Sequence, residues 1–214
     1  VYGAVALTPK SGSEWIVIQT DVDLPPGRMT PEIAASLNLA VIQGGPAVSA
    51  IGDVSYYRVQ GVEIRDLPGS TLRNNVVVFD TNRGVTASLA QPHHVILDRA
   101  YVHGNPPALQ LKRCVGLSGQ HVAVSNSSVL GCSKLGQDSQ AIWIADGLGP
   151  TAIVNNHLQA GSELVMSGGL DPHISGIVPS DIEIRGNYFH RPRSWKNAGI
   201  GVIKNLFEIK NARR

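Results

Sequence analysis

The chain has 214 residues, a net charge of +2 and 43% apolar residues, enough to bury a substantial core in one globular or solenoid unit. Its charges are dispersed, with no basic run beyond Arg213 and Arg214, which argues against a nucleic-acid partner. No apolar stretch reaches the roughly 18 residues of a membrane-spanning helix, so no span is predicted. Because the chain begins at Val1 rather than at Met, we expect a processed chain or a fragment.

The first 45 residues fit the later repeat poorly, and we expect residues 1–45 to form a cap over one open end of a solenoid. Residues 15–18 are predicted to form a strand. A short helix is predicted after Thr30, which is a favourable N-cap. Pro31 suits the first helical position, and Glu32 interacts favourably with the helix dipole. We expect the rest of the chain, residues 46–214, to form the repeating coils of the solenoid.

A repeat becomes visible in four later segments. Each has an apolar residue, a small or polar residue three positions later, and a second apolar residue two positions after that. These segments are Leu97/Ala100/Val102, Val124/Ser127/Val129, Ile153/Asn156/Leu158 and Ile184/Asn187/Phe189. Their first residues, 97, 124, 153 and 184, lie 27 to 31 positions apart. A period of about 30 residues with short strands and no helices predicts an all-β parallel solenoid.

A second set of strand-like segments lies between the first. They are residues 77–80, 109–112, 142–145, 164–167 and 207–210. In stacked coils, equivalent positions form columns. We expect one outward column to contain Val78, Gln110, Trp143, Val165 and Glu208. On another sheet, the outward positions should bring Tyr101, His103, His157, Tyr188 and His190 to one face.

The inward small or polar positions of the repeat, Ser127, Asn156 and Asn187, are predicted to form a structural ladder, because buried polar groups need hydrogen-bond partners. Cys114 and Cys132 fit neither a C-x-x-C redox motif nor a zinc cluster. Their spacing is compatible with a disulfide bond or with two buried thiols.

Residues 207–210 begin a further coil, and the sequence stops at Arg214 before that coil closes. Exposed strand edges template further pairing. We therefore expect that the chain comes from a longer protein or self-associates through this C-terminal coil.

The sequence resembles the pectin-lyase-like superfamily, and within it bacterial proteins described only as right-handed parallel β-helix repeat-containing. The resemblance rests on stretches along most of the chain, namely residues 56–64, 138–142, 153–158, 179–189, 194–196 and 204–212. It implies a right-handed parallel β-helix, secreted or at the cell surface, with a polysaccharide as partner. It implies no particular reaction, because this group has no settled activity and none of the superfamily's catalytic residues maps onto this chain.

Two surfaces are candidates for sugar binding. Trp143 could stack on the apolar face of a pyranose, unless the loop 146–151 covers it. The second platform consists of Tyr101, His157, Tyr188 and His190, for which the alternative is an ordinary solvated surface. Histidines of neighbouring coils, such as His94 and His121, could also chelate a metal, although no third ligand is evident.

Two reactions can be considered for a polysaccharide substrate. In β-elimination on a uronate, Ca²⁺ neutralises the sugar carboxylate and a basic side chain removes the C5 proton. Arg191, Arg193 and Lys196 are the candidate catalytic residues, with a solvated basic loop as the alternative. The candidate Ca²⁺ ligands are Glu163, Asp171 and Glu208. Hydrolysis needs a pair of carboxylates, and no such pair recurs at one column position.

We therefore predict an extracellular polysaccharide-binding solenoid that could be a polysaccharide lyase. The alternatives are a noncatalytic adhesin or structural solenoid, and a fragment of a larger glycan-degrading enzyme.

Overall fold

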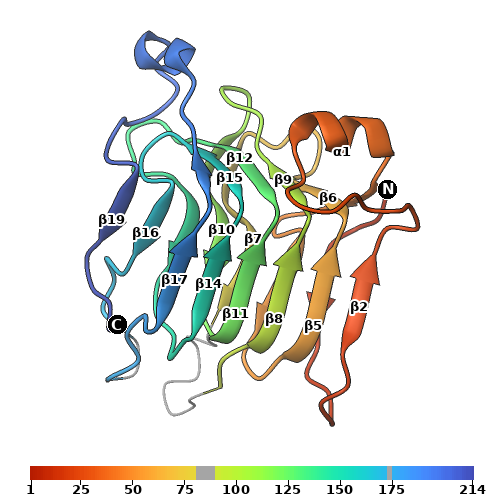
Figure 1. Cartoon of the computed structure of the whole chain (residues 1–214). Coiled ribbons are helices and arrows are strands. Elements are labelled where there is room, and N and C mark those ends of the chain that lie inside the picture. The colour runs from red at the N-terminus through yellow and green to blue at the C-terminus, as the bar shows by residue number, and fades with distance from the viewer. Residues whose placement is uncertain (81–89, 173–174) are drawn as a thin grey trace.

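A computed structural model describes residues 1–80, 90–172 and 175–214, which form three parallel sheets (Figure 1). Sheet I contains β1 (Val5–Leu7), β4 (Val48–Ile51), β7 (Leu72–Asp80), β10 (Gln110–Leu117), β13 (Gln140–Ile144), β16 (Val165–Ser167) and β19 (Phe207–Ile209). Sheet II contains β2 (Ile16–Gln19), β5 (Ser55–Gln60), β8 (His93–Asp98), β11 (Gln120–Ser125), β14 (Thr151–Val154) and β17 (Ile182–Arg185). Sheet III contains β3 (Ala40–Gln43), β6 (Val62–Arg65), β9 (Tyr101–His103), β12 (Ser128–Cys132), β15 (His157–Ala160) and β18 (Tyr188–Phe189).

Successive strands enter sheets I, II and III in turn, so each circuit of the chain adds one strand to every sheet. Strands make up 44% of the described residues and helices 6%, which agrees with the predicted all-β class. The arrangement is consistent with the predicted parallel β-solenoid. Among the described residues, no helix is long and apolar enough to cross a membrane.

The core follows the repeat predicted from the sequence. On sheet II, Leu97 pairs in register with Val124, and Ile153 pairs with Val124 and Ile184. On sheet III, Val129 pairs with Val102 and Leu158, and Leu158 pairs with Phe189. Except in the last coil, these side chains are fully buried. The prediction of stacked inward rows is thus confirmed, because each inward residue pairs with the equivalent residue of the next coil.

The predicted polar ladder also forms, at the turn between sheets II and III. Ser127 Oγ accepts a hydrogen bond from the backbone N–H of Ala100 at 3.0 Å. Asn156 Oδ1 accepts from the N–H of Ser127 at 2.9 Å, and Asn187 Oδ1 accepts from the N–H of Asn156 at 2.8 Å. Ser127 and Asn156 are fully buried. Each side chain satisfies backbone groups of the preceding coil, so the role of the ladder is structural.

The outward column predicted from the second set of strand-like segments has the wrong residue in two coils. In sheet I, the position equivalent to Val78 and Trp143 is held by Gly116 rather than Gln110. In the coil after Trp143 it is held by Met166 rather than Val165, and Glu208 follows as predicted. The error at Gln110 arises because β7 and β10 are long, with Gln110 pairing with Leu72 at the strand start. A four-residue alternation cannot identify its place within an eight-residue strand.

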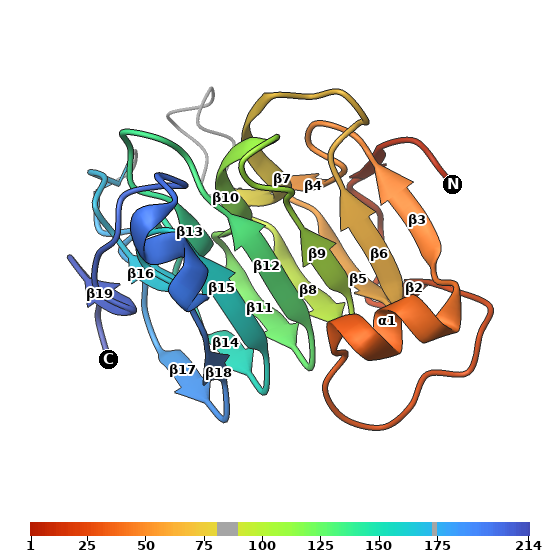
Figure 2. The ribbon, with the colours of Figure 1, turned by 90° about the horizontal axis from the view of Figure 1, so that it is seen from above.

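The N-terminal segment has the predicted elements but a different placement from a simple cap. Thr30 caps helix α1 (Pro31–Leu37), accepting from the N–H of Ile33 at 3.3 Å. However, β1, β2 and β3 pair with the first strands of the next coil, so residues 1–45 already form a coil. Helix α1 interrupts that coil between β2 and β3. It lies beside the strands of sheet III, as Figure 2 shows.

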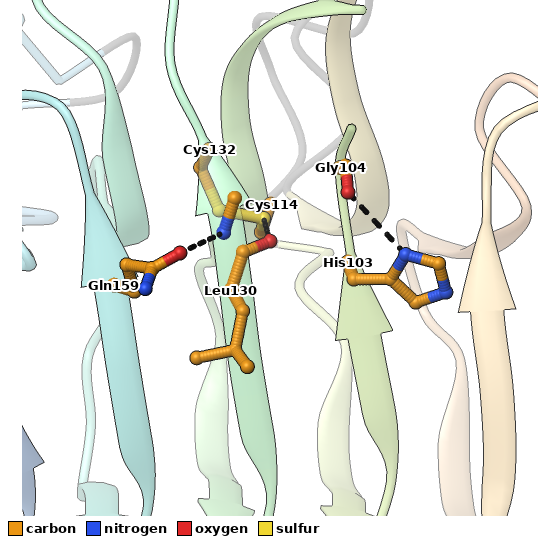
Figure 3. The surroundings of a disulfide bond; sticks show 7 residues. His103, Gly104, Cys114, Leu130, Cys132 and Gln159 are labelled. Atoms are coloured by element: carbon orange, nitrogen blue, oxygen red, sulfur yellow. Dashed lines mark hydrogen bonds between the residues drawn. A yellow bond between two sulfur atoms is a disulfide. The ribbon is translucent and has the colours of Figure 1, made fainter. Parts of the chain in front are cut away.

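A disulfide bond joins Cys114 of β10 to Cys132 of β12, with their Cα atoms 5.6 Å apart (Figure 3). Both residues are fully buried, and the bond connects sheets I and III within one coil. Of the two possibilities that the cysteine spacing left open, the structure contains the disulfide.

Strand β19 pairs with β16 and is the last strand of sheet I in this chain. Phe207 and Ile209 are 42% and 56% exposed. Self-association through this coil stays a prediction.

Candidate functional site

The predicted aromatic platform lies on the outer face of sheet III. Tyr101, Ser128, His157 and Tyr188 occupy one register position in four successive strands, as predicted. His190 follows β18, and its N–H bonds to the carbonyl of Leu158 at 3.0 Å. Strand alternation explains why these side chains share a face, because every second residue points away from the core.

A segment of the first coil, residues 21–30, crosses this face and divides the platform. We call it the strap. The N–H of Met29 bonds to the carbonyl of Asn126, and the Met29 carbonyl accepts from Ser128 Oγ, both at 2.7 Å. Arg28 donates to the carbonyls of Asn155 and Gly186 at 3.0 and 2.7 Å. Sequence analysis could not predict this contact, because it joins segments about one hundred or more residues apart.

On one side of the strap, Tyr101 packs against an apolar cluster around Met29, Ala34 and Leu39. Its ring stacks on His103 with centroids 4.4 Å apart. Burial, followed by the charges of Glu63 and Glu32, raises the pKa of Tyr101. Tyr101 therefore remains a neutral phenol at physiological pH and is a poor base.

Tyr101 and His103 line a cavity of about 660 Å³ formed with the loops that follow β6 and β9. His103 Nε2 lies 3.1 Å from Glu63 Oε1, and its Nδ1 lies 3.3 Å from the Gly104 carbonyl. The hydrogen bond with His103 lowers the pKa of Glu63. Both ring nitrogens of His103 therefore face oxygen acceptors of the protein. Nothing in the sequence linked Glu63 to His103.

On the other side of the strap, Tyr188 is exposed and forms a cluster with the partly buried His157 and His190. The ring of Tyr188 lies 4.9 Å from that of His157 and 5.6 Å from that of His190, measured between centroids. Tyr188 is 51% exposed. Burial, then the charges of His190 and Arg28, lower the pKa of His157, while Glu32 opposes them. His157 Nε2 and His190 Nδ1 are buried from solvent and have no hydrogen-bond partner among the described residues.

Trp143 is not available as a stacking platform in this structure. Its side chain is only 9% exposed, and the guanidinium of Arg113 lies 3.7 Å from the ring centroid. The indole N–H donates to the Gly168 carbonyl at 2.9 Å, and the ring packs with Ala145 and Met166. Arg113 supplies cover that the sequence did not reveal, because it lies on the neighbouring strand β10.

The three residues predicted to be catalytic lie in or next to the 3₁₀ turn η1 (Arg193–Asn197), which buries Trp195. Arg191 is engaged with backbone, donating to the carbonyls of Ala160, Ser162 and Lys204. Burial lowers the pKa of Arg191, against the opposing charge of Glu163. Arg193 and Lys196 are exposed. Arg191 thus holds loops together, and only Arg193 and Lys196 remain open to a ligand.

The three predicted Ca²⁺ ligands do not converge. Glu163 is fully buried before β16, where it accepts from Gln140 Nε2 at 2.7 Å and lies 3.4 Å from Lys204 Nζ. Asp171 follows the same strand, and Glu208 on β19 lies 3.5 Å from Lys210 Nζ. Across the described ranges, no group of three His, Cys, Asp or Glu side chains is placed to hold a metal. These carboxylates therefore do not fit a common Ca²⁺ site.

Lys204 is a residue that sequence analysis missed. Besides Glu163, it contacts Asp138 at 2.7 Å, and this hydrogen bond raises the pKa of Lys204. The loop before β19 brings it to this position from 66 residues away, so no local pattern could have identified the pair.

No protein-family profile, curated protein or solved structure matches this chain.

Proposed function

We propose that this chain belongs to a right-handed parallel β-helix of the pectin-lyase-like kind, secreted or at the cell surface, that binds polysaccharide on sheet III. The three parallel sheets and the coil-by-coil register support the architecture. The buried disulfide supports the location, because disulfides persist in oxidising compartments.

The observation that carries the proposal is the exposed ring of Tyr188, which the partly buried His157 and His190 flank. An exposed Tyr ring offers an apolar surface to the C–H face of a pyranose. Because β15 and β18 are paired strands, the cluster is held rigidly. Arg193 and Lys196, exposed on η1 in the following segment, add positive charge that favours an acidic glycan.

Binding is better supported than cleavage. In β-elimination a base removes the C5 proton, the C4–O bond breaks, and the leaving oxygen takes up a proton. The groups of the 660 Å³ cavity are poorly suited to the first step. Tyr101 stays protonated, and both nitrogens of His103 already face acceptors. The predicted base Arg191 is occupied by backbone carbonyls.

The proposal is tested by affinity electrophoresis on a panel of neutral and acidic polysaccharides. We expect Tyr188→Ala to reduce retardation on at least one of them without lowering the melting temperature. Tyr2→Ala is the matched control, because Tyr2 is 64% exposed on the first coil, far along the solenoid from β18. It should run as the unsubstituted chain does.

A chain that is not retarded by any glycan, or a Tyr188→Ala variant retarded as strongly as the parent, would favour the adhesin or structural alternative. The same panel, incubated with Ca²⁺ or a chelator and assayed for unsaturated sugars, tests lyase activity and the Ca²⁺ requirement. Release of unsaturated sugars would show that the chain cleaves the polysaccharide as well as binding it.

A further inference from the structure

A second aromatic column lies at the starts of the sheet II strands, which stand side by side at the front of Figure 1. Tyr56, His94 and His121 occupy equivalent positions, because the residues that follow them pair in register. The ring of His94 stacks on Tyr56 at 4.7 Å and on His121 at 4.5 Å, between centroids. These contacts fix the His94 ring from both sides.

The backbone at this column explains an unusual pairing of neighbouring side chains. Successive residues of a strand normally point to opposite faces. His94, however, has a φ of 53°, in the left-handed region that non-glycine residues rarely adopt. As a result His93 and His94 approach each other, with their Nδ1 atoms 3.0 Å apart. Strand alternation applied to the sequence would have placed the two histidine side chains on opposite faces of the strand.

The separation of the two Nδ1 atoms suits a shared metal ion. Imidazole nitrogens bind Zn²⁺ and similar ions at about 2.0–2.1 Å. Two such ligands at a right angle, as in tetragonal Cu²⁺ sites, would lie about 2.9 Å apart, and at a tetrahedral angle about 3.4 Å apart. The observed 3.0 Å is closer to the tetragonal value.

The neighbouring groups also suit this role. The other nitrogen of His93, Nε2, lies 3.7 Å from Asp53 Oδ1, and a carboxylate beside the distal nitrogen commonly orients a ligating histidine. A cation, Lys10, lies near this aromatic column, with its Nζ 5.3 Å from the centroid of the Tyr56 ring. His121 is in face-to-face contact with His94, so the lone pairs in its ring plane do not converge with those of His94.

We propose that His93 and His94 bind a divalent transition-metal ion, Cu²⁺ ahead of Zn²⁺, through their two Nδ1 atoms. Water completes the coordination, since no third protein ligand is at hand among the residues the structure describes. The preference for Cu²⁺ follows from the Irving–Williams order and from the tetragonal bite. The site is separate from the platform on sheet III and does not rest on the proposed polysaccharide binding.

Binding requires both Nδ1 atoms to be free of protons. In the neutral pair, one Nδ1–H shares its proton with the other ring, and the metal moves that proton to Nε2 without changing the oxidation state of any group. On His93 the relocated Nε2–H faces Asp53. Affinity should fall as the pH drops and the rings protonate.

The test is calorimetric titration of the intact chain with Cu²⁺ and Zn²⁺, together with electron paramagnetic resonance of the Cu²⁺ form. We expect coupling to two nitrogens and a loss of at least about tenfold in affinity in His94→Asn and in His93→Gln. Asn tolerates the left-handed backbone, so His94→Asn should keep the fold, as an unchanged melting temperature would show.

The matched control is His121→Asn, the same substitution in the same column, where φ is 48°. Because it removes a stacking contact and no ligand, it should weaken Cu²⁺ binding far less than His94→Asn does, and a His157→Gln, His190→Gln double variant should bind as the parent chain does. The proposal is overturned if His94→Asn and His93→Gln bind as tightly as the parent, or if His121→Asn weakens binding as much as they do. Loss of binding only in the His157, His190 variant would place the ion on sheet III and also overturn it.

Discussion

The two ends of sheet II carry two side-chain columns that run along the solenoid and behave differently. At the turn to sheet III, Ser127, Asn156 and Asn187 accept hydrogen bonds from backbone N–H groups of the preceding coil. At the opposite end, Tyr56, His94 and His121 contact each other through ring faces. The first column uses its polar atoms internally. The second leaves the edges of its rings, which carry the nitrogens, for other partners.

This difference separates a structural column from a candidate binding column. Buried amides must be satisfied within the protein, and the ladder meets that requirement. Stacking satisfies no hydrogen bond, so it orders the imidazoles without using their nitrogens. A repeated polar column in a solenoid therefore suggests binding when its polar atoms remain accessible after the coils have stacked.

The largest effect should follow from Asn156→Ala. The change leaves the N–H of Ser127 and the carbonyl of Val124 without their side-chain partners in the core. At roughly 1–3 kcal/mol for each buried group, the free energy of unfolding should fall by about 3 kcal/mol. The melting temperature should then drop by about 6–12 °C. Asn197→Ala, at an exposed position on η1, is the control and should change little.

The two ends of sheet II should also lose stability in different pH windows. The pKa of His94 is lowered from 6.5 by burial and by neighbouring histidines. Burial works to raise the pKa of Asp98, but hydrogen bonds from Asn126, Arg99 and Ser125 lower it from 3.8. In both cases the folded state binds fewer protons. Each group therefore stabilises the fold fully at a pH above its ordinary pKa. This stabilisation is lost as the pH falls from the ordinary pKa towards the lower pKa of the folded state.

Thermal melts from pH 8 to pH 3 should accordingly show a first decline below about pH 6.5 and a second below about pH 4. The first decline should shrink in His94→Asn, although His157, whose pKa is also lowered, retains a share. The second should persist in that variant. A single decline unaffected by His94→Asn would mean that the imidazole column does not contribute to pH-dependent stability.

The smallest effect on stability is expected for His121→Asn. One stacked ring pair contributes about 0.5–1.5 kcal/mol, and Asn tolerates the left-handed backbone at this position. Chemical denaturation should therefore show a loss of about 1 kcal/mol or less. A loss as large as that of Asn156→Ala would show that the aromatic column is as structural as the ladder.

Sequence alone determined the all-β class with parallel strands, the inward rows through Leu97, Val124, Ile153 and Ile184, and the polar ladder. The reason is that coil stacking places each inward residue against its own equivalents, so the contacts that select it recur with the period of the chain. The register of Tyr101, His157 and Tyr188 follows from the same rule. The frame through Gln110 was misplaced because the long strand β10 has several positions that fit a short alternation.

Only the tertiary structure decided which outward residues are accessible and what they contact. Arg113 covers Trp143, and the strap divides the platform. Arg191 uses its guanidinium to donate hydrogen bonds to backbone carbonyls. The pairs Glu63–His103 and Lys204–Glu163 join residues from different coils or loops. Outward side chains meet loops of irregular length, which do not share the period of the repeat. Even the adjacent residues His93 and His94 needed the structure, because one left-handed residue reverses the direction that strand alternation predicts.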